Sequence, residues 1–317
     1  MNTALDLAAI RAAHERIRPH IHRTPVLTSA RLDAASGASL FFKCENFQKV
    51  GAFKARGATN AVFMLDEATA KHGVATHSSG NHAAALSRAA KLRGIPAHIV
   101  MPSNTLKVKV RAVEEYGGRI VFCEPNQTSR EETCARVIAE TGATLIHPFE
   151  NPDVMAGQGT AAIELLEDVD VDLILCPVSG GGLLCGTAVA AKAVRPQIKV
   201  VAVEPATADD AAQSFRAGKI VRVEPHTIAD GLRANIGAPN FQMMQRFVDD
   251  VVTVSEEGII AAMRAIWETM KIIVEPSGAV AYAAILEHKI NVSAQRVGII
   301  LSGGNVDLDA LPWMKNK

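Results

Sequence analysis

The sequence predicts an α/β protein built from two open parallel-sheet units with a ligand-binding cleft between them. Short β-rich runs alternate with helical patterns over residues 72–148, and a second alternating series follows over residues 157–307. Such alternation is typical of parallel strands joined by helices that cover the faces of a sheet. The apolar runs of the second series end in turns rich in Gly or Pro, where the carboxyl ends of parallel strands place ligands.

The first part of the chain is expected to form early strands and then one alternating unit. Residues 22–32 and 38–47 have strand patterns, and the alanine-rich helical pattern of residues 81–94 leads into the apolar run 97–102. The alternation continues with helices at 104–118 and 129–142 and strands at 119–125 and 144–148. Glycines at the ends of these helical patterns mark their C-termini.

The second unit is expected to begin with a helix over residues 157–169. An apolar strand then runs into a glycine-rich turn and a helix of small residues, all within residues 172–194. Further strands are predicted at residues 199–205 and in the apolar run at the start of residues 296–307. No linker, low-complexity tract or tandem repeat separates the two units.

Composition excludes several classes of function. The 317 residues contain 33 Lys and Arg and 33 Asp and Glu, without a block of like charge, so nucleic acid and anionic membranes are not expected partners. The apolar runs are shorter than the roughly 20 residues of a membrane helix, and the charged N-terminal stretch does not resemble a secretory signal. The five scattered cysteines, never in C-x-x-C pairs, predict reduced thiols in a cytoplasmic protein.

A lysine lies inside a nearly uncharged segment of small residues. In the stretch VGAFKARGA, Lys54 is bracketed by Gly51 and Gly57. Such a lysine can extend its ammonium into water from the first turn of a helix. Alternatively, the amine is partly buried, and desolvation then lowers its pKa, as a Schiff-base lysine requires. Spacing alone leaves both interpretations open.

The stretch PVSGGGLLCGTAVAAKA is the clearest candidate for a ligand-binding loop. An apolar strand runs into Ser179 and the three glycines Gly180 to Gly182, and a helix of small residues follows. Backbone N–H groups of such a loop converge on an anion at the helix N-terminus, so a phosphate-bearing ligand is expected, with a plain tight turn as the alternative. The pattern G-x-G-x-x-G fails because Cys185 occupies its third glycine position, so the ligand need not be a nucleotide.

Two further turns carry polar groups. The stretch THSSGNHAAAL places Ser78, Ser79 and Asn81 before a helix, where they bind a carboxylate or simply cap the helix. The stretch IILSGGNVD places Ser302 at the end of a strand, where it faces a ring nitrogen or caps a turn. Both turns therefore have a functional and a purely structural interpretation.

The stretch VEPATADDAAQS contains three closely spaced carboxylates, Glu204, Asp209 and Asp210. Carboxylates and carbonyls at this spacing suit a hard divalent cation. A solvated start of a helix explains the same spacing equally well. The pattern alone therefore leaves a metal site open.

Taken together, these stretches resemble one enzyme family along nearly the whole chain. The matching blocks follow one another in the family's order: HRTPVLTS, FFKCENFQKVGAFKARGA, THSSGNHA, HPFENPDVMAGQGT, SGGGL, VEPATADDAAQS, TIADGL, VEPSGA and LSGGNVDL. The sequence is similar to the fold type II pyridoxal-phosphate enzymes, in the branch of serine racemase, serine/threonine dehydratase and 3-hydroxyaspartate ammonia-lyase. The resemblance implies a tryptophan synthase β-like fold and a homodimer. It also implies a discontinuous large cofactor-binding domain at 1–66 and 149–317 and a small domain at 67–148.

The resemblance also implies a role for each matching residue. Lys54 is expected to hold pyridoxal 5'-phosphate as a Schiff base, and Ser79 to be the second acid/base on the opposite face. Asn81 is expected to contact the phenolic oxygen and Ser302 the pyridine nitrogen. The cofactor-binding residues are then Phe53, Lys54, Asn81, Ser179, Gly180, Gly181, Gly182 and Ser302. The substrate-binding residues are Ser78, Ser79, Asn81, His82 and Arg130. The residues that match the family's site for Mg²⁺, Ca²⁺ or Mn²⁺ are Glu204, Ala208 through its carbonyl, and Asp210.

The activity that the resemblance implies is β-elimination from a β-hydroxy amino acid. L-serine, L-threonine or 3-hydroxyaspartate would give a 2-oxo acid and ammonia. A serine racemase with elimination as a side reaction is the alternative, and a binding protein that keeps the fold without the chemistry is an alternative of another class. Arg130, in NQTSREE, either binds the second carboxylate of 3-hydroxyaspartate or pairs with Glu131 or Glu132 on a helix surface.

Overall fold

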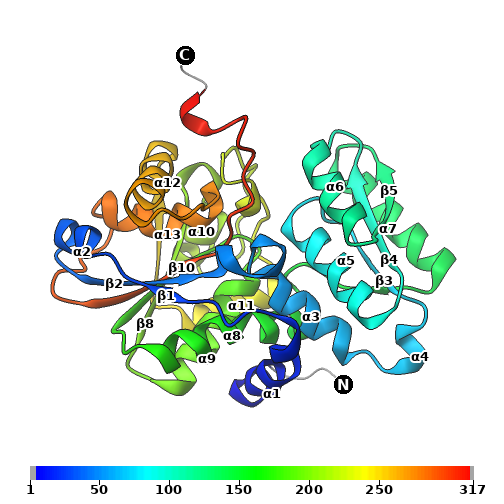
Figure 1. Ribbon diagram of the computed structural model, residues 1–317, viewed down its shortest axis with the longest axis horizontal. Coiled ribbons are helices and arrows are strands. Elements are labelled where there is room, and N and C mark those ends of the chain that lie inside the picture. The colour runs from blue at the N-terminus through cyan, green and yellow to red at the C-terminus, as the bar shows by residue number, and fades with distance from the viewer. Residues whose placement is uncertain (1–4, 315–317) are drawn as a thin grey trace.

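The computed structural model describes residues 5–314, which form two lobes side by side (Figure 1). The larger lobe is built on a six-stranded sheet and the smaller on a four-stranded sheet. All strand pairings in these sheets are parallel except that between β1 and β2. The predicted α/β class with parallel sheets is therefore confirmed. No helix in residues 5–314 has the length and apolar character needed to cross a membrane.

The six-stranded sheet has the last strand of residues 5–314 near its middle, in the order β1-β2-β10-β7-β8-β9. Its strands are β1 (Val26–Leu27), β2 (Ser39–Cys44), β7 (Leu173–Pro177), β8 (Lys199–Pro205), β9 (Asp250–Val254) and β10 (Arg296–Leu301). Val297 of β10 lies opposite Leu40 of β2 and Leu173 of β7. Because these strands are parallel, the loops that follow β2, β7 and β10 all leave the same edge of the sheet.

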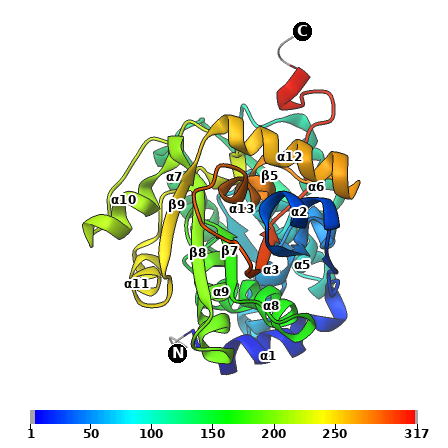
Figure 2. The same ribbon diagram turned by 90° about the vertical axis from the view of Figure 1, so that its left-hand side faces the viewer.

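Helices cover both faces of this sheet (Figure 2). The helices of the large lobe are α1 (Leu7–Ile17), α2 (Ala30–Ser36), α3 (Lys54–Met64), α8 (Pro152–Asp168), α9 (Gly182–Val194), α10 (Asp210–Ala217), α11 (Ala238–Phe247), α12 (Glu256–Met270) and α13 (Pro276–Leu286). On one face, α12 and α13 enclose a core in which the rings of Phe42 and Tyr282 meet edge to face at 5.6 Å. On the other face, α8 and α9 pack against Ile174 and Ile300. Burial of each such apolar side chain contributes about 1.5–3 kcal/mol to the stability of the fold.

The small lobe has the strand order β5-β4-β3-β6. Its strands are β3 (Val74–Thr76), β4 (Ala97–Pro102), β5 (Arg119–Cys123) and β6 (Thr144–Leu145), and its helices are α4 (Glu67–Ala70), α5 (Asn81–Arg93), α6 (Lys107–Glu115) and α7 (Gln127–Thr141). The strand β4 is buried along its whole length, as expected for the interior of a parallel sheet. The domain boundaries at residues 66 and 148 stay a prediction.

One predicted strand is largely wrong. Residues 22–32 contribute only the two-residue strand β1, and the helix α2 begins at Ala30. The side chain of Ser29 accepts a hydrogen bond from the backbone N–H of Leu32, so it caps this helix. A serine before a short amphipathic turn is a helix start signal, and here it outweighs the β-branched residues that precede it.

The helix α3 is fixed to the large lobe by a close crossing with α8. A Cβ placed on Gly157 would lie 2.6 Å from the Cα of Gly57, so the two backbones approach too closely for larger residues. Next to this crossing, the buried guanidinium of Arg56 bonds to Glu45 and Glu164 over 2.7–2.8 Å. Because Arg56 lies two residues after Lys54, this ion cluster also fixes the start of α3.

Candidate active site

Lys54 begins α3 after a loop with unusual backbone angles. Val50 and Gly51 both have positive φ, of 58° and 69°. A β-branched residue rarely adopts this conformation, so its surroundings must hold it there. The backbone N–H of Phe53 donates to the carbonyl of Ser302 over 3.0 Å. The loop that carries the lysine is thus attached to the carboxyl end of β10.

The amine of Lys54 points into the protein. Its Nζ donates to the carbonyl of Pro148 over 2.9 Å and lies 5.2 Å from the centre of the Phe53 ring. Burial lowers the pKa of the amine to about 8. No carboxylate of residues 5–314 forms an ion pair with it. Of the two interpretations of this lysine, the structure favours the buried amine over one extended into water.

The glycine-rich loop connects β7 to α9. Gly181 is the N-cap of α9, has a φ of 95°, and is accompanied by no side-chain cap. A Cβ on Gly180 would collide with the ring of Phe149, and one on Gly181 would lie 2.6 Å from Cδ1 of Ile236. Glycine is therefore required at both positions. The first N–H groups of this 13-residue helix lack side-chain partners, which leaves an anion site at its start.

The two hydroxyls predicted to contact a cofactor both bond to the backbone. The hydroxyl of Ser179 donates to the carbonyl of Ala234 over 2.9 Å and accepts from the Ala234 N–H over 3.0 Å. The hydroxyl of Ser302 makes a longer bond of 3.3 Å to the carbonyl of Ser277. Ser179 thus anchors the glycine loop to a neighbouring loop, whereas Ser302 is held weakly.

Asn81, the first residue of α5, has both atoms of its amide engaged. Its Nδ2 donates to Oε1 of Glu275 over 2.9 Å, and its Oδ1 accepts from Nδ2 of Asn305 over 2.9 Å. Asn305 also donates to the carbonyl of Val50, over 2.7 Å. One proton of the Asn81 Nδ2 remains for a ligand. The network joins the first turn of α5 to the loop that precedes Lys54.

The turn before α5 presents a second helix start without a side-chain cap. Gly80 is the N-cap of α5, and no side chain there accepts a hydrogen bond from the first N–H groups of the helix. The hydroxyl of Ser78 accepts from the Gly80 N–H over a long 3.4 Å, and that of Ser79 has no hydrogen bond to residues 5–314. This turn therefore offers hydroxyls and N–H groups to an anion, and its role in binding a substrate carboxylate stays a prediction.

The ring of His82 is not suited to bind such an anion. It is buried, and its Nε2 lies 3.0 Å from the carbonyl of Ile146. Burial, together with the charge of Lys54, lowers its pKa to about 3, so the ring is neutral. A neutral ring that donates from Nε2 has an acceptor at Nδ1 and repels a carboxylate. Only the backbone N–H of His82 suits the predicted substrate contact.

Arg130 lies in the first turn of α7, beside the active-site turn. It forms no ion pair with Glu131 or Glu132 among the described residues, and its buried Nε has no hydrogen-bond partner there. Its charge lowers the pKa of His77, after the larger effect of burial, which places the two groups near each other. The interpretation as a surface ion pair is therefore not supported.

Comparison with known proteins decides the family. The family model described as pyridoxal-phosphate dependent enzyme matches residues 17–303. The chain belongs to this family. A serine racemase of Arabidopsis thaliana is 53% identical over 315 residues, which cover 97% of this chain and 95% of the relative. A beta-hydroxyaspartate dehydratase of Paracoccus denitrificans is 52% identical over 304 residues, with 95% and 96% covered. The solved structure of maize serine racemase has a TM-score of 0.95 and 51% identity, covering 99% of this chain and 97% of that chain.

Membership explains the resemblance noted in the sequence, and the fold type II architecture is confirmed. The protein is a pyridoxal-phosphate dependent enzyme, and its lysine and glycine-rich loop lie at the same sheet edge. The alternative of a binding protein without chemistry is therefore set aside.

The acidic stretch folds as a buried turn between β8 and α10. Glu204 accepts from the N–H of Ala212 over 2.6 Å, and Asp210 accepts from that of Ile236 over 2.6 Å. Burial raises the pKa of Glu204 to about 9 and that of Asp210 to about 6. No described group of three or more His, Cys, Asp or Glu side chains surrounds a common point, so any ion here would also need carbonyl ligands.

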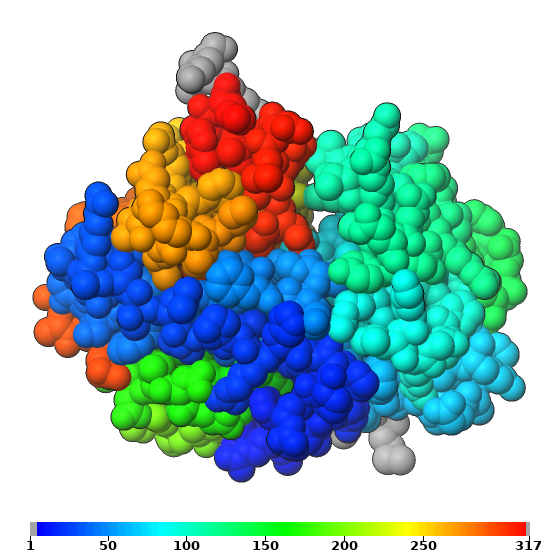
Figure 3. All heavy atoms as spheres, in the orientation of Figure 1, coloured from blue at the N-terminus to red at the C-terminus, as the bar shows by residue number. Residues whose placement is uncertain are grey.

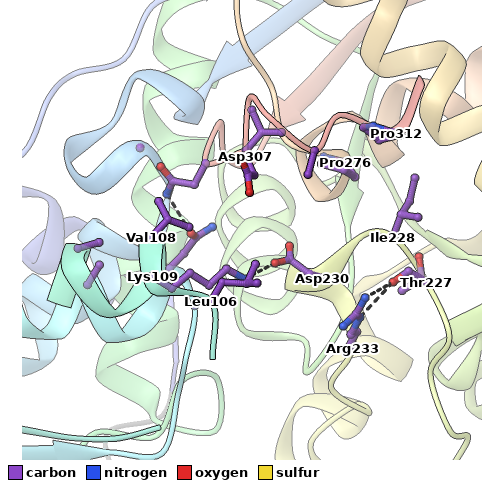
Figure 4. A pocket seen from close by; sticks show the side chains of 18 of the residues that line it. Leu106, Val108, Lys109, Thr227, Ile228, Asp230, Arg233, Pro276, Asp307 and Pro312 are labelled. Atoms are coloured by element: carbon purple, nitrogen blue, oxygen red, sulfur yellow. Dashed lines mark hydrogen bonds and ion pairs between the residues drawn. The ribbon is translucent and has the colours of Figure 1, made fainter. Parts of the chain in front are cut away.

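A large cavity of 1190 Å³ lies in the cleft, between residues of both lobes. The space-filling view shows the hollow between the C-terminal segment and the small lobe (Figure 3). Gly80 and Asn81 line it from one side and Asn305 from the other. Lys109 of α6 and Asp230 of η5 (Asp230–Leu232) form an ion pair across it (Figure 4). The cavity thus reaches the active-site turn from the mouth of the cleft.

Sequence reasoning missed three participants. Glu275 lies inside the matching block VEPSGA, but its partner Asn81 is 194 residues away. Pro148 contributes only a backbone carbonyl to Lys54, which no residue pattern reveals. Asn240 bonds to the glycine loop from a helix 60 residues further on. Glu275 and Pro148 each had one signal, their place in the blocks VEPSGA and HPFENPDVMAGQGT, whereas Asn240 lies in none of the matching blocks.

Proposed function

We propose that Lys54 binds pyridoxal phosphate covalently in the cleft between the lobes. The chemistry of the surrounding groups fits this cofactor. An amine with lowered pKa and no carboxylate partner suits attack on an aldehyde, and the uncapped start of α9, at Gly180 to Gly182, suits a phosphate. The weakly held hydroxyl of Ser302 suits the pyridine nitrogen, and the remaining proton of Asn81 Nδ2 suits the phenolic oxygen.

Bound there, the cofactor withdraws electrons from the substrate Cα. The neutral amine of Lys54 is the base that takes the Cα proton, and its pKa of about 8 keeps a useful neutral fraction at physiological pH. The substrate carboxylate lies at the start of α5, against Ser78, Asn81 and the backbone N–H of His82. This fixes the Cα–H beside Lys54. Loss of the β-hydroxyl as water and hydrolysis then give a 2-oxo acid and ammonia.

The substrate that the site supports best is a β-hydroxy amino acid with a second carboxylate, 3-hydroxyaspartate. The observation that carries this choice is the half-buried guanidinium of Arg130, which has no carboxylate partner among the described residues. A buried unpaired cation is costly, and a bidentate carboxylate from the substrate would relieve the cost. The relative named beta-hydroxyaspartate dehydratase is consistent with this substrate. L-serine and L-threonine lack the second carboxylate and would leave Arg130 unpaired.

The test compares substrates on the purified enzyme. Absorption spectra are recorded while L-serine, L-threonine and the threo and erythro forms of 3-hydroxyaspartate are added, and the 2-oxo acid is assayed. We expect hydroxyaspartate to react fastest. In Arg130→Leu, the kcat/KM for hydroxyaspartate should fall about tenfold or more, while the kcat/KM for serine should change little. Equal losses for serine and hydroxyaspartate would refute the role of Arg130. A cofactor absorption band that survives in Lys54→Ala would refute the covalent assignment.

Serine racemisation is a second candidate, favoured by the unengaged hydroxyl of Ser79. This hydroxyl has no hydrogen bond to residues 5–314, so it is available to return a proton to Cα from the face opposite Lys54. Several relatives are named serine racemases. We expect Ser79→Ala to abolish D-serine formation while part of the elimination remains. If the unaltered enzyme forms no D-serine from L-serine, racemisation is ruled out.

We also propose a divalent cation, Mg²⁺ by preference over Ca²⁺ or Mn²⁺, at Glu204, Asp210 and the carbonyl of Ala208. Two buried carboxyl groups without a paired cation support it, since a bound ion would take the place of the proton that burial favours on Glu204. Addition of Mg²⁺ should raise the melting temperature by a few degrees, and chelation should reverse this. The Asp210→Asn variant should show no response to the ion. An equal response in this variant would place the ion elsewhere.

We further propose a cytoplasmic homodimer. The five cysteines are buried and unpaired, as expected for a reducing compartment. The dimer rests on the resemblance to the family. Sedimentation velocity should give about twice the mass of 33.7 kDa. A single species at the monomer mass would contradict the dimer.

A further inference from the structure

Asn240 lies in the first turn of α11, and its side-chain amide joins two segments that are far apart in the sequence. The side chain is fully buried. Its Nδ2 donates to the carbonyl of Gly180 over 2.5 Å and to that of Phe149 over 2.9 Å. Phe149 follows Pro148, whose carbonyl binds the amine of Lys54. One amide therefore connects the glycine loop to the segment of Pro148 and Phe149, which contacts the lysine.

The direction of the Asn240 amide follows from its chemistry. With the amide reversed, Oδ1 would face two carbonyl oxygens, and three acceptors would meet without a proton. With Nδ2 donating, Oδ1 has no hydrogen bond to any described residue. An unpaired buried acceptor costs stability, and an apolar side chain of the same size would avoid that cost. The two bonds that the amide donates offset this cost, because they satisfy the carbonyls of Gly180 and Phe149.

These bonds determine the orientation of the peptide between Gly180 and Gly181. The carbonyl of Gly180 also accepts from the N–H of Gly237 over 3.2 Å. In a planar trans peptide, the carbonyl and the following N–H point in opposite directions, so the N–H of Gly181 points away from Asn240. Because glycine tolerates either orientation of such a peptide, the backbone alone does not fix it. Asn240 and Gly237 supply the preference.

We propose that Asn240 is a positioning residue for the cofactor phosphate. It holds the Gly180–Gly181 peptide with the N–H of Gly181 turned toward the phosphate. The inference rests on the proposed phosphate site at residues 179–182. It adds to that site a residue that contacts neither the cofactor nor the substrate.

The test uses two aldehydes that differ only in the phosphate. Both pyridoxal phosphate and pyridoxal form the absorption band of a lysine-bound cofactor, so both dissociation constants can be measured on the cofactor-free protein. In Asn240→Leu, we expect affinity for pyridoxal phosphate to fall about ten- to a hundredfold and affinity for pyridoxal to stay within about twofold. The matched control is Gln245→Leu, which removes an exposed amide on the same helix that donates to the carbonyl of Phe215.

Each outcome decides a different point. Equal losses for both aldehydes, or no loss for either, would overturn the positioning role of Asn240. If the unaltered protein binds both aldehydes equally well, the proposed phosphate site fails, and the inference fails with it. Should Asn240→Leu not fold, Asn240→Ser takes its place, because its hydroxyl is too short to reach both carbonyls. Its melting temperature then separates a loss of folding from a loss of phosphate affinity.

Discussion

At the scale of the residue, Lys54 is prepared for reaction before any ligand arrives. Its amine sits in an uncharged environment with a carbonyl as its described partner, and the pKa falls from its ordinary value of 10.5 to about 8. An amine attacks an aldehyde only in its neutral form. Burial alone therefore increases the reactive fraction at physiological pH by a large factor.

This gives a prediction for the pH dependence of cofactor capture. The rate at which the cofactor-free protein binds pyridoxal phosphate should rise with pH and reach half its plateau near pH 8. Rapid mixing with absorbance detection measures the rate, and N-acetyl-lysine methylamide in the same buffers corrects for the ionisation of the aldehyde. A midpoint near the 10.5 of an ordinary lysine would contradict the burial of the amine.

Glu275 gives a second prediction, for stability. Burial, and then the charge of Asp230, raise its pKa to about 8 from an ordinary value of 4.5. Between these values the folded state keeps a proton that the unfolded chain has released, so the free energy of unfolding falls as pH rises from about 4.5 to about 8. The Glu275→Gln variant should show a smaller fall over this range in urea unfolding. Glu257→Gln, on the exposed surface of α12, is the control and should leave the profile unchanged.

Residues differ in how far the sequence reveals them. Lys54 and the glycines of the loop could be identified as candidates because each lies in a contiguous pattern, although the pattern left the burial of the amine open. Asn240 and Glu275 were not, because each acts on a group between 60 and 194 residues away. The direction of the His82 ring was also hidden, since it depends on the carbonyl of Ile146.

At the scale of the element, the position of Lys54 depends on how closely α3 approaches α8. A Cβ on Gly57 would lie 2.6 Å from the carbonyl oxygen of Val154, and the backbone N–H of Gly57 donates to Gln158 over 3.1 Å. A methyl group at this point must push the helices apart. Because α3 carries the lysine on its first residue, the shift would also displace the amine.

We therefore predict that Gly57→Ala lowers the free energy of unfolding by about 1–3 kcal/mol, the usual cost of an overpacked core. Denaturant unfolding measures the change. Gly80→Ala is the control for stability, because a Cβ there meets no atom within 4 Å. If Gly57→Ala is as stable as the unaltered protein, the crossing of α3 and α8 accommodates a methyl group and the prediction is wrong.

The elements themselves were mostly predictable. Buried parallel strands such as β4 and β10 are continuous apolar runs, and glycines mark the ends of α5 and α7. The strand predicted over residues 22–32 was largely wrong for a local reason. Ser29 caps the helix α2, whose first residues lie within the predicted strand. Pairing order was beyond the sequence, because the place of β10 between β2 and β7 depends on contacts across most of the chain.

At the scale of the whole molecule, the two lobes meet across the cleft through the ion pair of Lys109 and Asp230. Both side chains are about one-third exposed, so water and salt weaken the attraction. Lys109→Met should change the free energy of unfolding by less than about 1 kcal/mol. It should raise the KM and make the KM less sensitive to salt, because the pair spans the cavity that reaches the active-site turn. Lys107→Met, an exposed lysine of the same helix, should leave the KM and its salt dependence unchanged.

The relative placement of the lobes could not be read from the sequence. Lys109 and Asp230 are 121 residues apart, and neither lies in a pattern that suggests the other. The cleft was expected only because two parallel sheets present their carboxyl edges to ligands.

The central position of β10 has a consequence for synthesis on the ribosome. Lys54 emerges early, but the strand that anchors its loop is translated after all the other described strands and must insert between β2 and β7. The small-lobe sheet is contiguous in sequence and complete once residue 145 has emerged, whereas the large-lobe sheet must wait for residue 301. A nascent chain therefore displays the lysine without its cleft, and the ability to retain the cofactor arises only after residue 301 has emerged.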